Sequence, residues 1–159
     1  MTYNLPLPYK SQAKNRRSNS LTTVNVQRNQ HYRSASAFKL AYGTAVRTAL
    51  PEVLPSYTAC KLEYILHIQP TKGNPTKTDP YRNSVPKQLD LVNLLAVVDK
   101  VNSDILVSEK VIPDDSIAHI QSVSFSVNPW SNTDYIEVRV IKAESIPDPR
   151  KETHEKQTT

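Results

Sequence analysis

The interpretation of this chain rests on the stretch Leu89-Asp90-Leu91-Val92-Asn93-Leu94-Leu95-Ala96-Val97-Val98-Asp99-Lys100, followed downstream by Val111-Ile112-Pro113-Asp114-Asp115-Ser116. The first run predicts a helix with Asp90 in its first turn and Asn93 beside it on the same face. The second run predicts a turn that carries two adjacent acids. If the fold brings these runs together, three carboxylates and an amide converge, and such a cluster needs a cation. Hard oxygen ligands favour Mg²⁺, with Mn²⁺ as the alternative.

These runs resemble the RusA family of crossover-junction endodeoxyribonucleases, the Holliday junction resolvases. In that family the helix motif is usually Asp-x-Asp-Asn-Leu-x-x-Lys, and a later Asp-Asp pair completes a magnesium site that cuts DNA. By position, Asp90, Asn93 and Leu94 match the helix motif. Asp115 matches the catalytic member of the later pair, and Asp114 precedes it. The resemblance spans roughly residues 21–120, although its specific part is these two runs.

Two positions depart from the family motif. Val92 stands where the second helix aspartate belongs, and Ala96 stands where the lysine belongs. Asp99 shares nearly the same helix face as Val92 but lies about 10 Å further along the axis, so it does not simply replace the missing acid. Lys100 lies one turn beyond Ala96, and its long side chain is a candidate replacement for the missing lysine. With one acid fewer, metal affinity is expected to fall.

The resemblance implies metal-assisted hydrolysis of phosphodiester bonds in a four-way (Holliday) junction, with Asp90, Asp114 and Asp115 as the catalytic and metal-binding acids. Because a junction has two-fold-related strands to cut, a homodimer is expected. One alternative is a weakened or inactive relative that binds branched DNA without cutting it. A second alternative is that these acids are ordinary surface residues of a helix and a turn.

Basic residues are concentrated in the first third of the chain. The net charge is +5 and the pI about 9.3. Eight of the 20 basic residues, and none of the 15 acidic residues, precede Glu52. This distribution predicts nucleic-acid binding, and a solvated basic face or tail is the alternative. The candidate DNA-binding residues, named from this charge and from the resemblance, are Arg28, Asn29, His31, Arg33, Lys39, Asn93 and Lys100.

Composition excludes several other classes of protein. A single cysteine, Cys60, allows neither an internal disulfide nor a cysteine-rich zinc site, and its context predicts a buried apolar residue. Two glycines are too few for a Gly-rich nucleotide-binding loop, so no nucleotide cofactor is expected. No apolar run approaches the ~20 residues of a membrane span, and the N-terminus lacks a signal-peptide core. A cytoplasmic protein without membrane contact is therefore expected.

In the first half of the chain, residues 1–20 are predicted to be a basic flexible arm, and Leu21–Val26 the first strand. The alternative is that Leu5–Pro8 belongs to the fold. A helix capped by Ser34 or Ser36 is predicted to run to about Leu50. Its expected buried face is rich in small residues, namely Ala37, Leu40, Ala41, Thr44, Ala45 and Thr48. Lys61–Gln69 alternates as a strand with Leu62, Tyr64, Leu66 and Ile68 on one side, and His67 on the other is expected to be structural or exposed.

The second half begins with a long polar loop, Pro70–Pro86, predicted to be a mobile flap over the site. The central helix is expected from Lys87 to Asn102, with Ser103–Lys110 connecting it to the Asp-Asp turn. Ile117–Val127 and Tyr135–Lys142 alternate and are predicted to pair as a hairpin. The prediction is an α+β fold, a single RusA-like domain over residues 21–144 with a mixed sheet and two main helices in the order β-α-β-α-β-β, and a disordered tail at 145–159.

Overall fold

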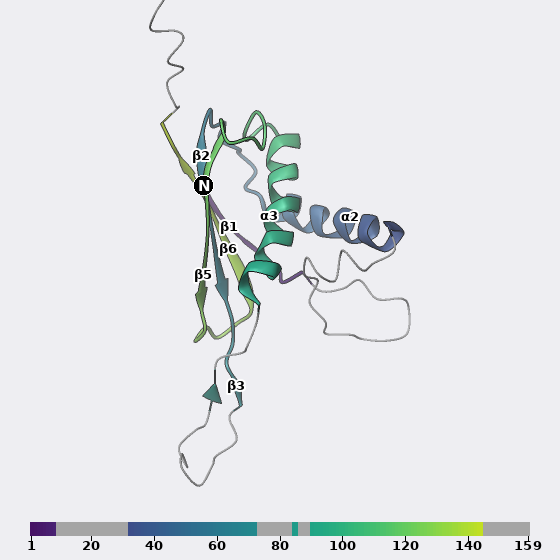
Figure 1. The fold of residues 1–159 in the computed structure, drawn as a ribbon, viewed down its shortest axis with the longest axis vertical. Coiled ribbons are helices and arrows are strands. Elements are labelled where there is room, and N and C mark those ends of the chain that lie inside the picture. The colour runs from purple at the N-terminus through teal and green to yellow at the C-terminus, as the bar shows by residue number, and fades with distance from the viewer. Residues whose placement is uncertain (9–31, 73–83, 86–89, 145–159) are drawn as a thin grey trace, which may run out of the picture.

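The structure, a computed structural model, describes residues 1–8, 32–72, 84–85 and 90–144. Within these ranges the chain forms an α+β domain in which two long helices lie on one side of a mixed four-stranded sheet (Figure 1). The predicted fold class and β-α-β-α-β-β order are confirmed. Two short strands, β3 (Thr71–Lys72) and β4 (Ser84–Val85), pair with each other outside the main sheet. They lie within the segment predicted to be a long loop.

The main sheet has the strand order β1-β6-β2-β5. The strand β2 (Cys60–His67) pairs in parallel with β5 (Ile120–Asn128) and antiparallel with β6 (Tyr135–Lys142). The alternation that predicted β2 is confirmed, because apolar residues on one side of a strand face the core while their neighbours face outward. The predicted inward-facing residues Leu62, Tyr64, Leu66 and Ile68 are all buried.

The predicted hairpin between the last two strands is wrong. The strand β2 lies between β5 and β6, so these consecutive strands do not pair. The connecting loop crosses the end of β2, where Ser131 N–H donates to the Ile68 carbonyl at 3.1 Å and Asp134 Oδ1 accepts from Gln69 N–H at 2.7 Å. Alternation along a strand specifies which side is buried but not which strand is its neighbour, so the sequence pattern could not exclude this arrangement.

The first strand also differs from the main prediction. The strand β1 is Thr2–Leu5, which pairs antiparallel with β6 and buries Tyr3 and Leu5 in the core. Leu7 is buried as well. The prediction of a flexible arm is therefore wrong for residues 1–8, and the alternative that placed Leu5–Pro8 in the fold is the one observed. Residues 9–31, including the predicted strand Leu21–Val26, lie outside the described residues.

The first long helix is α2 (Tyr32–Ala49), which begins slightly before the predicted caps and ends where predicted. Its buried face was predicted wrongly. Phe38, Tyr42 and Val46 face the core at spacings of four residues, whereas Leu40 is 71% exposed. The face with the large side chains is buried instead of the predicted face of small residues, because large aromatic side chains remove more apolar area from water.

The second long helix is α3 (Leu91–Ser108). It continues to Ser108, beyond the predicted end at Asn102, so most of the predicted connection Ser103–Lys110 is helical. The helix ends in a Schellman motif: Lys110 adopts a left-handed conformation at φ 61°, its N–H donates to the Val107 carbonyl, and Val111 N–H donates to the Leu106 carbonyl. The buried side chains of Leu106 and Val111 complete the motif.

A single apolar core fills the space between the sheet and the two helices. Cys60 belongs to it, as predicted, and burial raises the pKa of its thiol. The helices pack on each other where Gly43 of α2 faces Ile105 of α3, because an added Cβ at Gly43 would lie 3.4 Å from the Ile105 side chain. Among the described helices, none combines the length and apolarity that crossing a bilayer requires.

Candidate functional site

Asp90 caps the N-terminus of α3. Its backbone is extended, at φ −79° and ψ 90°, and its Oδ1 accepts from Asn93 N–H at 3.2 Å. The Asn93 side-chain amide donates to the other carboxylate oxygen, Oδ2. Such a cap satisfies a helix N–H that has no partner within the helix. Asp90 and Asn93 are therefore adjacent, as predicted, but they hydrogen-bond to each other and cap the start of the helix.

Of the next two positions of the helix motif, Val92 faces solvent and Leu94 faces the core. Val92 is 63% exposed, so the position at which the resembling family has an acid faces solvent on α3. Leu94 is buried in the core. Val92 therefore contributes little to packing. An aspartate placed there would meet water rather than the core.

Lys100 binds two carboxylates. Its ammonium lies 2.8 Å from Asp104 Oδ1 and 3.0 Å from Asp115 Oδ2. Hydrogen bonds to these acids raise the pKa of Lys100, and the bond and charge of Lys100 lower the pKa of Asp115. Because Asp104 lies one turn further along α3, the ammonium is directed away from Ala96. The predicted replacement of the missing lysine by Lys100 is thus not made in this conformation.

The Asp-Asp turn is held at its base by buried residues. Val111 and Ile112 are buried just before it, and the Val111 carbonyl accepts from Tyr57 N–H at 2.8 Å. Within the turn, Asp114 Oδ1 accepts from the N–H of Asp115 at 2.9 Å, and both acids are exposed. The turn is therefore fixed where it leaves the core, while its carboxylates face solvent.

Asp90 caps the start of α3, whereas Asp114 and Asp115 lie on the turn that follows the helix. Ten residues separate Asp90 from Lys100, which corresponds to about 15 Å along the helix axis. Asp115 is held at the Lys100 level by the ion pair. In the part of the chain that the structure describes, no group of three His, Cys, Asp or Glu side chains is arranged to hold a metal ion. The predicted convergence of Asp90, Asp114 and Asp115 is therefore not found among the described residues.

Sequence reasoning missed a buried polar chain beneath this surface. Tyr3 OH donates to Asn102 Oδ1 at 2.6 Å, Asn102 Nδ2 donates to Tyr64 OH at 3.0 Å, and Tyr64 OH donates to Asp99 Oδ1 at 2.8 Å. Burial raises the pKa of Asp99, against the opposing effect of the Tyr64 hydrogen bond. The polar residues Asn102 and Ser103 on the buried side of α3, three and four residues after Asp99, were the available signal.

The candidate DNA-binding residues are only partly accounted for. Arg28, Asn29 and His31 lie outside the described residues. Arg33 lies in the first turn of α2, and Lys39 is exposed further along that helix. Asn93 and Lys100 are engaged by the acids described above. Among the candidates whose side chains are described, Lys39 is therefore the one that is exposed and takes no part in the capping or ion pairs of α3.

His67 has a structural role on the outer side of the sheet, within the prediction made for it. Its ring stacks on Tyr135 with centroids 4.2 Å apart, and its Nε2 lies 3.1 Å from Glu137 Oε2. Its Nδ1 lies 3.3 Å from the Asn128 amide. Arg139, and after it His67, lowers the pKa of Glu137. Both ring nitrogens of His67 therefore have partners within the protein, so neither is directed at a metal ion or substrate.

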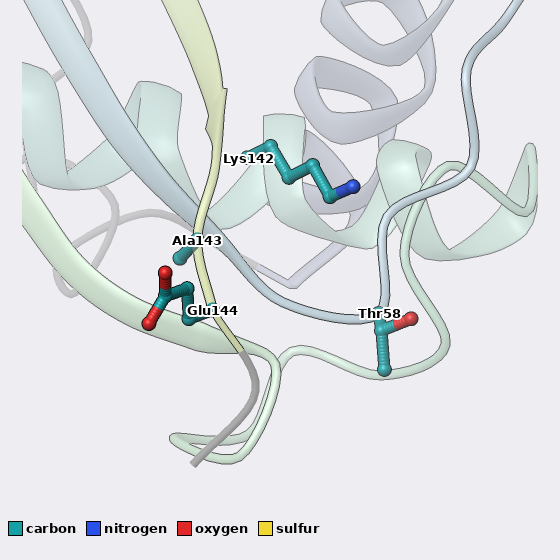
Figure 2. A pocket seen from close by; sticks show the side chains of 4 residues that line it. All are labelled: Thr58, Lys142, Ala143 and Glu144. Atoms are coloured by element: carbon teal, nitrogen blue, oxygen red, sulfur yellow. The ribbon is translucent and has the colours of Figure 1, made fainter.

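A surface pocket lies between the entry to β2 and the end of β6, lined by Thr58, Lys142, Ala143 and Glu144 (Figure 2). The Thr58, Lys142 and Glu144 side chains point in different directions rather than toward a common point (Figure 2). Converging polar groups are what a small-molecule site requires to fix a ligand. This pocket therefore adds no chemistry to the candidate site on α3.

No protein-family model matches the chain, and no curated protein matches it significantly.

Proposed function

We propose that this chain is a RusA-like protein that binds branched DNA, with the four-way junction as its ligand, and that it cuts DNA weakly or not at all. The observation that carries the second part is the pairing of Asp115 with Lys100 at 3.0 Å, about 15 Å along α3 from Asp90. Exposed Val92 adds no acid between them. A metal-dependent nuclease needs carboxylates that share an ion, so the separation of Asp90 from Asp115 supports weak or absent cutting.

The DNA-binding part of the proposal is supported by charge and by the sequence resemblance. Eight basic residues and no acidic residue precede Glu52, and Lys39 presents its charge to solvent on α2. Phosphate contacts of this kind supply salt-dependent affinity without reading sequence. The branched form of the ligand comes from the resemblance of the 89–100 and 111–116 runs to the resolvase motif.

A second candidate, the magnesium-dependent junction resolvase, is favoured by one observation. Asp90, Asp114 and Asp115 are all exposed, and the Lys100–Asp115 pair is itself half-exposed. Exposed ion pairs are screened by solvent and stabilise little, so a divalent ion competing for Asp115 meets little resistance. Asp90 would still lie two to three turns away along α3. The Asp-Asp turn would therefore have to move before the acids shared an ion.

The decisive experiment combines binding and cleavage of a labelled four-way junction, with a linear duplex of the same arm sequence as control. Mobility shifts at several salt concentrations measure binding, and denaturing gels with Mg²⁺, Mn²⁺ or chelator measure nicks. We expect salt-sensitive preference for the junction and no nicks. Paired, metal-dependent nicks near the branch point would instead identify a resolvase. Absence of binding to either DNA would refute the nucleic-acid function.

Two matched pairs of variants sharpen this test. Lys39→Ala should weaken binding and reduce the salt slope by about one, whereas Lys61→Ala, which removes the same charge from an exposed position on β2, should not. Val92→Asp restores the family's acid, and Val53→Asp adds the same charge at a loop position that is 85% exposed. Metal-dependent nicking by the Val92 variant alone would show that the missing acid is what prevents cleavage. Equal behaviour of Lys39→Ala and Lys61→Ala would contradict a DNA-contacting role for α2.

A further inference from the structure

The two ring nitrogens of His67 face partners with opposite hydrogen-bonding roles. Nε2 lies 3.1 Å from Glu137 Oε2, and an ionised carboxylate only accepts hydrogen bonds. Nδ1 lies 3.3 Å from Asn128 Nδ2, the amino group of a side-chain amide, which only donates. The proton of the neutral ring therefore belongs on Nε2, and Nδ1 must be without one. These partners fix a single neutral tautomer of His67.

The backbone of Trp130 fixes the orientation of the Asn128 amide. Asn128 Oδ1 accepts from the Trp130 N–H at 3.3 Å, and a backbone N–H only donates. Pro129, between them, has no N–H of its own. If the amide turned over, its amino group would face the Trp130 N–H, and two donors would oppose each other. Asn128 therefore connects the ring of His67 to the turn that carries Trp130.

A second proton on His67 conflicts with this arrangement. A protonated ring donates from both nitrogens, so Nδ1–H would face the amino group of Asn128. Turning the ring over gives the same conflict, because either nitrogen then carries a proton. The ring is also held in place, since it stacks on Tyr135 with the two planes 5° apart and its side chain is only 13% exposed. Relief has to come from Asn128, whose Oδ1 must leave the Trp130 N–H to reach Nδ1.

The charged groups near His67 do not remove this conflict. The strand β5 carries no charged residue. The charged or titratable groups that β2, β6 and the loop before β6 place on the His67 side of the sheet are Lys61, Glu63, Asp134, Tyr135, Glu137 and Arg139. Arg139 donates to Glu137 at 2.6 Å and lowers the pKa of that carboxyl, so Glu137 stays ionised and accepts from Nε2 in either form of the ring. Protonation therefore breaks the contact with Asn128 and leaves the contact with Glu137.

We propose that His67 is a proton-sensitive latch on the Asn128–Trp130 turn, in which uptake of a proton from solvent at Nδ1 breaks the Asn128 contact and frees the Trp130 N–H. Histidine side chains ordinarily gain this proton between roughly pH 8 and pH 5. The change is local, because the Ser131 N–H still donates to the Ile68 carbonyl further along the loop. It acts on Trp130, which is 58% exposed. The latch does not depend on DNA binding.

NMR of the isotope-labelled full chain, from about pH 8 to about pH 5, tests the latch. At the upper end the imidazole nitrogens should show the Nε2–H tautomer. As the pH falls, the Trp130 amide proton should move upfield, because it loses its acceptor. Trp130 is the only tryptophan in the chain, so its fluorescence should report the same transition independently. The Nδ1–H tautomer in the neutral ring, or a Trp130 amide that does not respond to pH, would overturn the proposal.

Two variants at position 128 separate the latch from a general effect of pH. Asn128→Asp keeps His67 but offers only acceptors, which suit both the Trp130 N–H and a protonated Nδ1. Its Trp130 amide should therefore keep the high-pH position of the wild type throughout the titration. Asn128→Ala removes the acceptor of the Trp130 N–H, so its Trp130 amide should lie upfield at every pH. A wild-type transition in either variant would contradict the proposed coupling.

Two histidine variants complete the test. His67→Phe keeps a ring that can stack on Tyr135 but removes both nitrogens, so the transition should disappear. His119→Gln is the matched control, because His119 contacts the Thr58 carbonyl at the opposite end of β5, and the transition should be unchanged. Circular dichroism checks that each variant is folded, and Asn128→Asp decides the outcome with His67 intact if His67→Phe is not. A transition that persists in folded His67→Phe, or is lost in His119→Gln, would refute the latch.

Discussion

Replacing Asn102 by alanine tests whether the buried polar chain holds α3 to the sheet. Asn102 is fully buried and connects two strands, because it accepts from Tyr3 of β1 and donates to Tyr64 of β2. Alanine removes both bonds. Tyr64 still donates to Asp99, but the Tyr3 hydroxyl becomes a buried donor without its described acceptor. The main cost therefore falls on Tyr3.

The size of this cost follows from the two losses. A buried donor without a partner costs about 1–3 kcal/mol, and removing the amide adds a cavity of a few atoms worth about 1 kcal/mol. We expect Asn102→Ala to reduce the free energy of unfolding by about 2–4 kcal/mol. For a domain of this size that corresponds to a melting temperature lower by roughly 5–15 °C.

A double-mutant cycle measures the part due to Tyr3. Tyr3→Phe removes the donor itself, so Asn102→Ala should cost less in the Tyr3→Phe background than in the wild type. Urea denaturation of the four proteins should give a coupling of about 0.5–3 kcal/mol between the two positions. Strict additivity, or a loss below about 0.5 kcal/mol for Asn102→Ala alone, would show that the chain of hydrogen bonds does not stabilise the fold.

Three further predictions concern the neighbouring residues. Burial raises the pKa of Asp99 above its ordinary value of 3.8, so the ionised form is disfavoured in the folded state. Asp99→Asn can still accept the hydrogen bond from Tyr64 and should therefore increase the free energy of unfolding at pH 7. Urea denaturation at several pH values should show this gain shrinking as the pH falls through the folded-state pKa toward 3.8. Lys110→Gly removes the steric cost of a side chain in the left-handed conformation and should add about 1 kcal/mol to the free energy of unfolding. Lys110→Ala keeps a Cβ at this position and should add nothing. Lys100→Ala should raise the pKa of Asp115, measured by carbon-detected NMR titration, because Lys100 is the partner that most favours the ionised carboxylate of Asp115. An unchanged pKa would mean that the ion pair does not form in solution.

The sequence was most informative where one side of an element is buried and the other is not. The alternation of Lys61–Gln69 identified β2, and the four residues that it placed on the inner side are all buried, since a half-buried strand has a period of two. Pro51 correctly predicted the end of α2. In both cases the controlling interaction is local to the segment, so the segment alone contains the information.

The sequence was least informative where partners are distant. That β5 pairs with β2 rather than with β6 depends on a loop that crosses the end of β2, and the strand pattern is the same in either arrangement. The buried face of α2 was likewise decided by contacts of Phe38 and Tyr42 with the core, which compete with a weaker pattern of small residues. The separation of Asp90 from Asp115 depends on the length of α3 and on the path of the chain after it.

The charge balance around Lys100 bears most directly on function. Carboxylates on neighbouring elements repel unless a cation lies between them. In the resembling family that cation is a metal, held in part by the acid that Val92 replaces here. In this chain Lys100 supplies the positive charge to Asp104 and Asp115 from within α3, and the pKa of Asp115 falls accordingly. We infer that Val92 and Lys100 belong together, because the ammonium of Lys100 offsets the repulsion between Asp104 and Asp115 that a cation would otherwise have to offset.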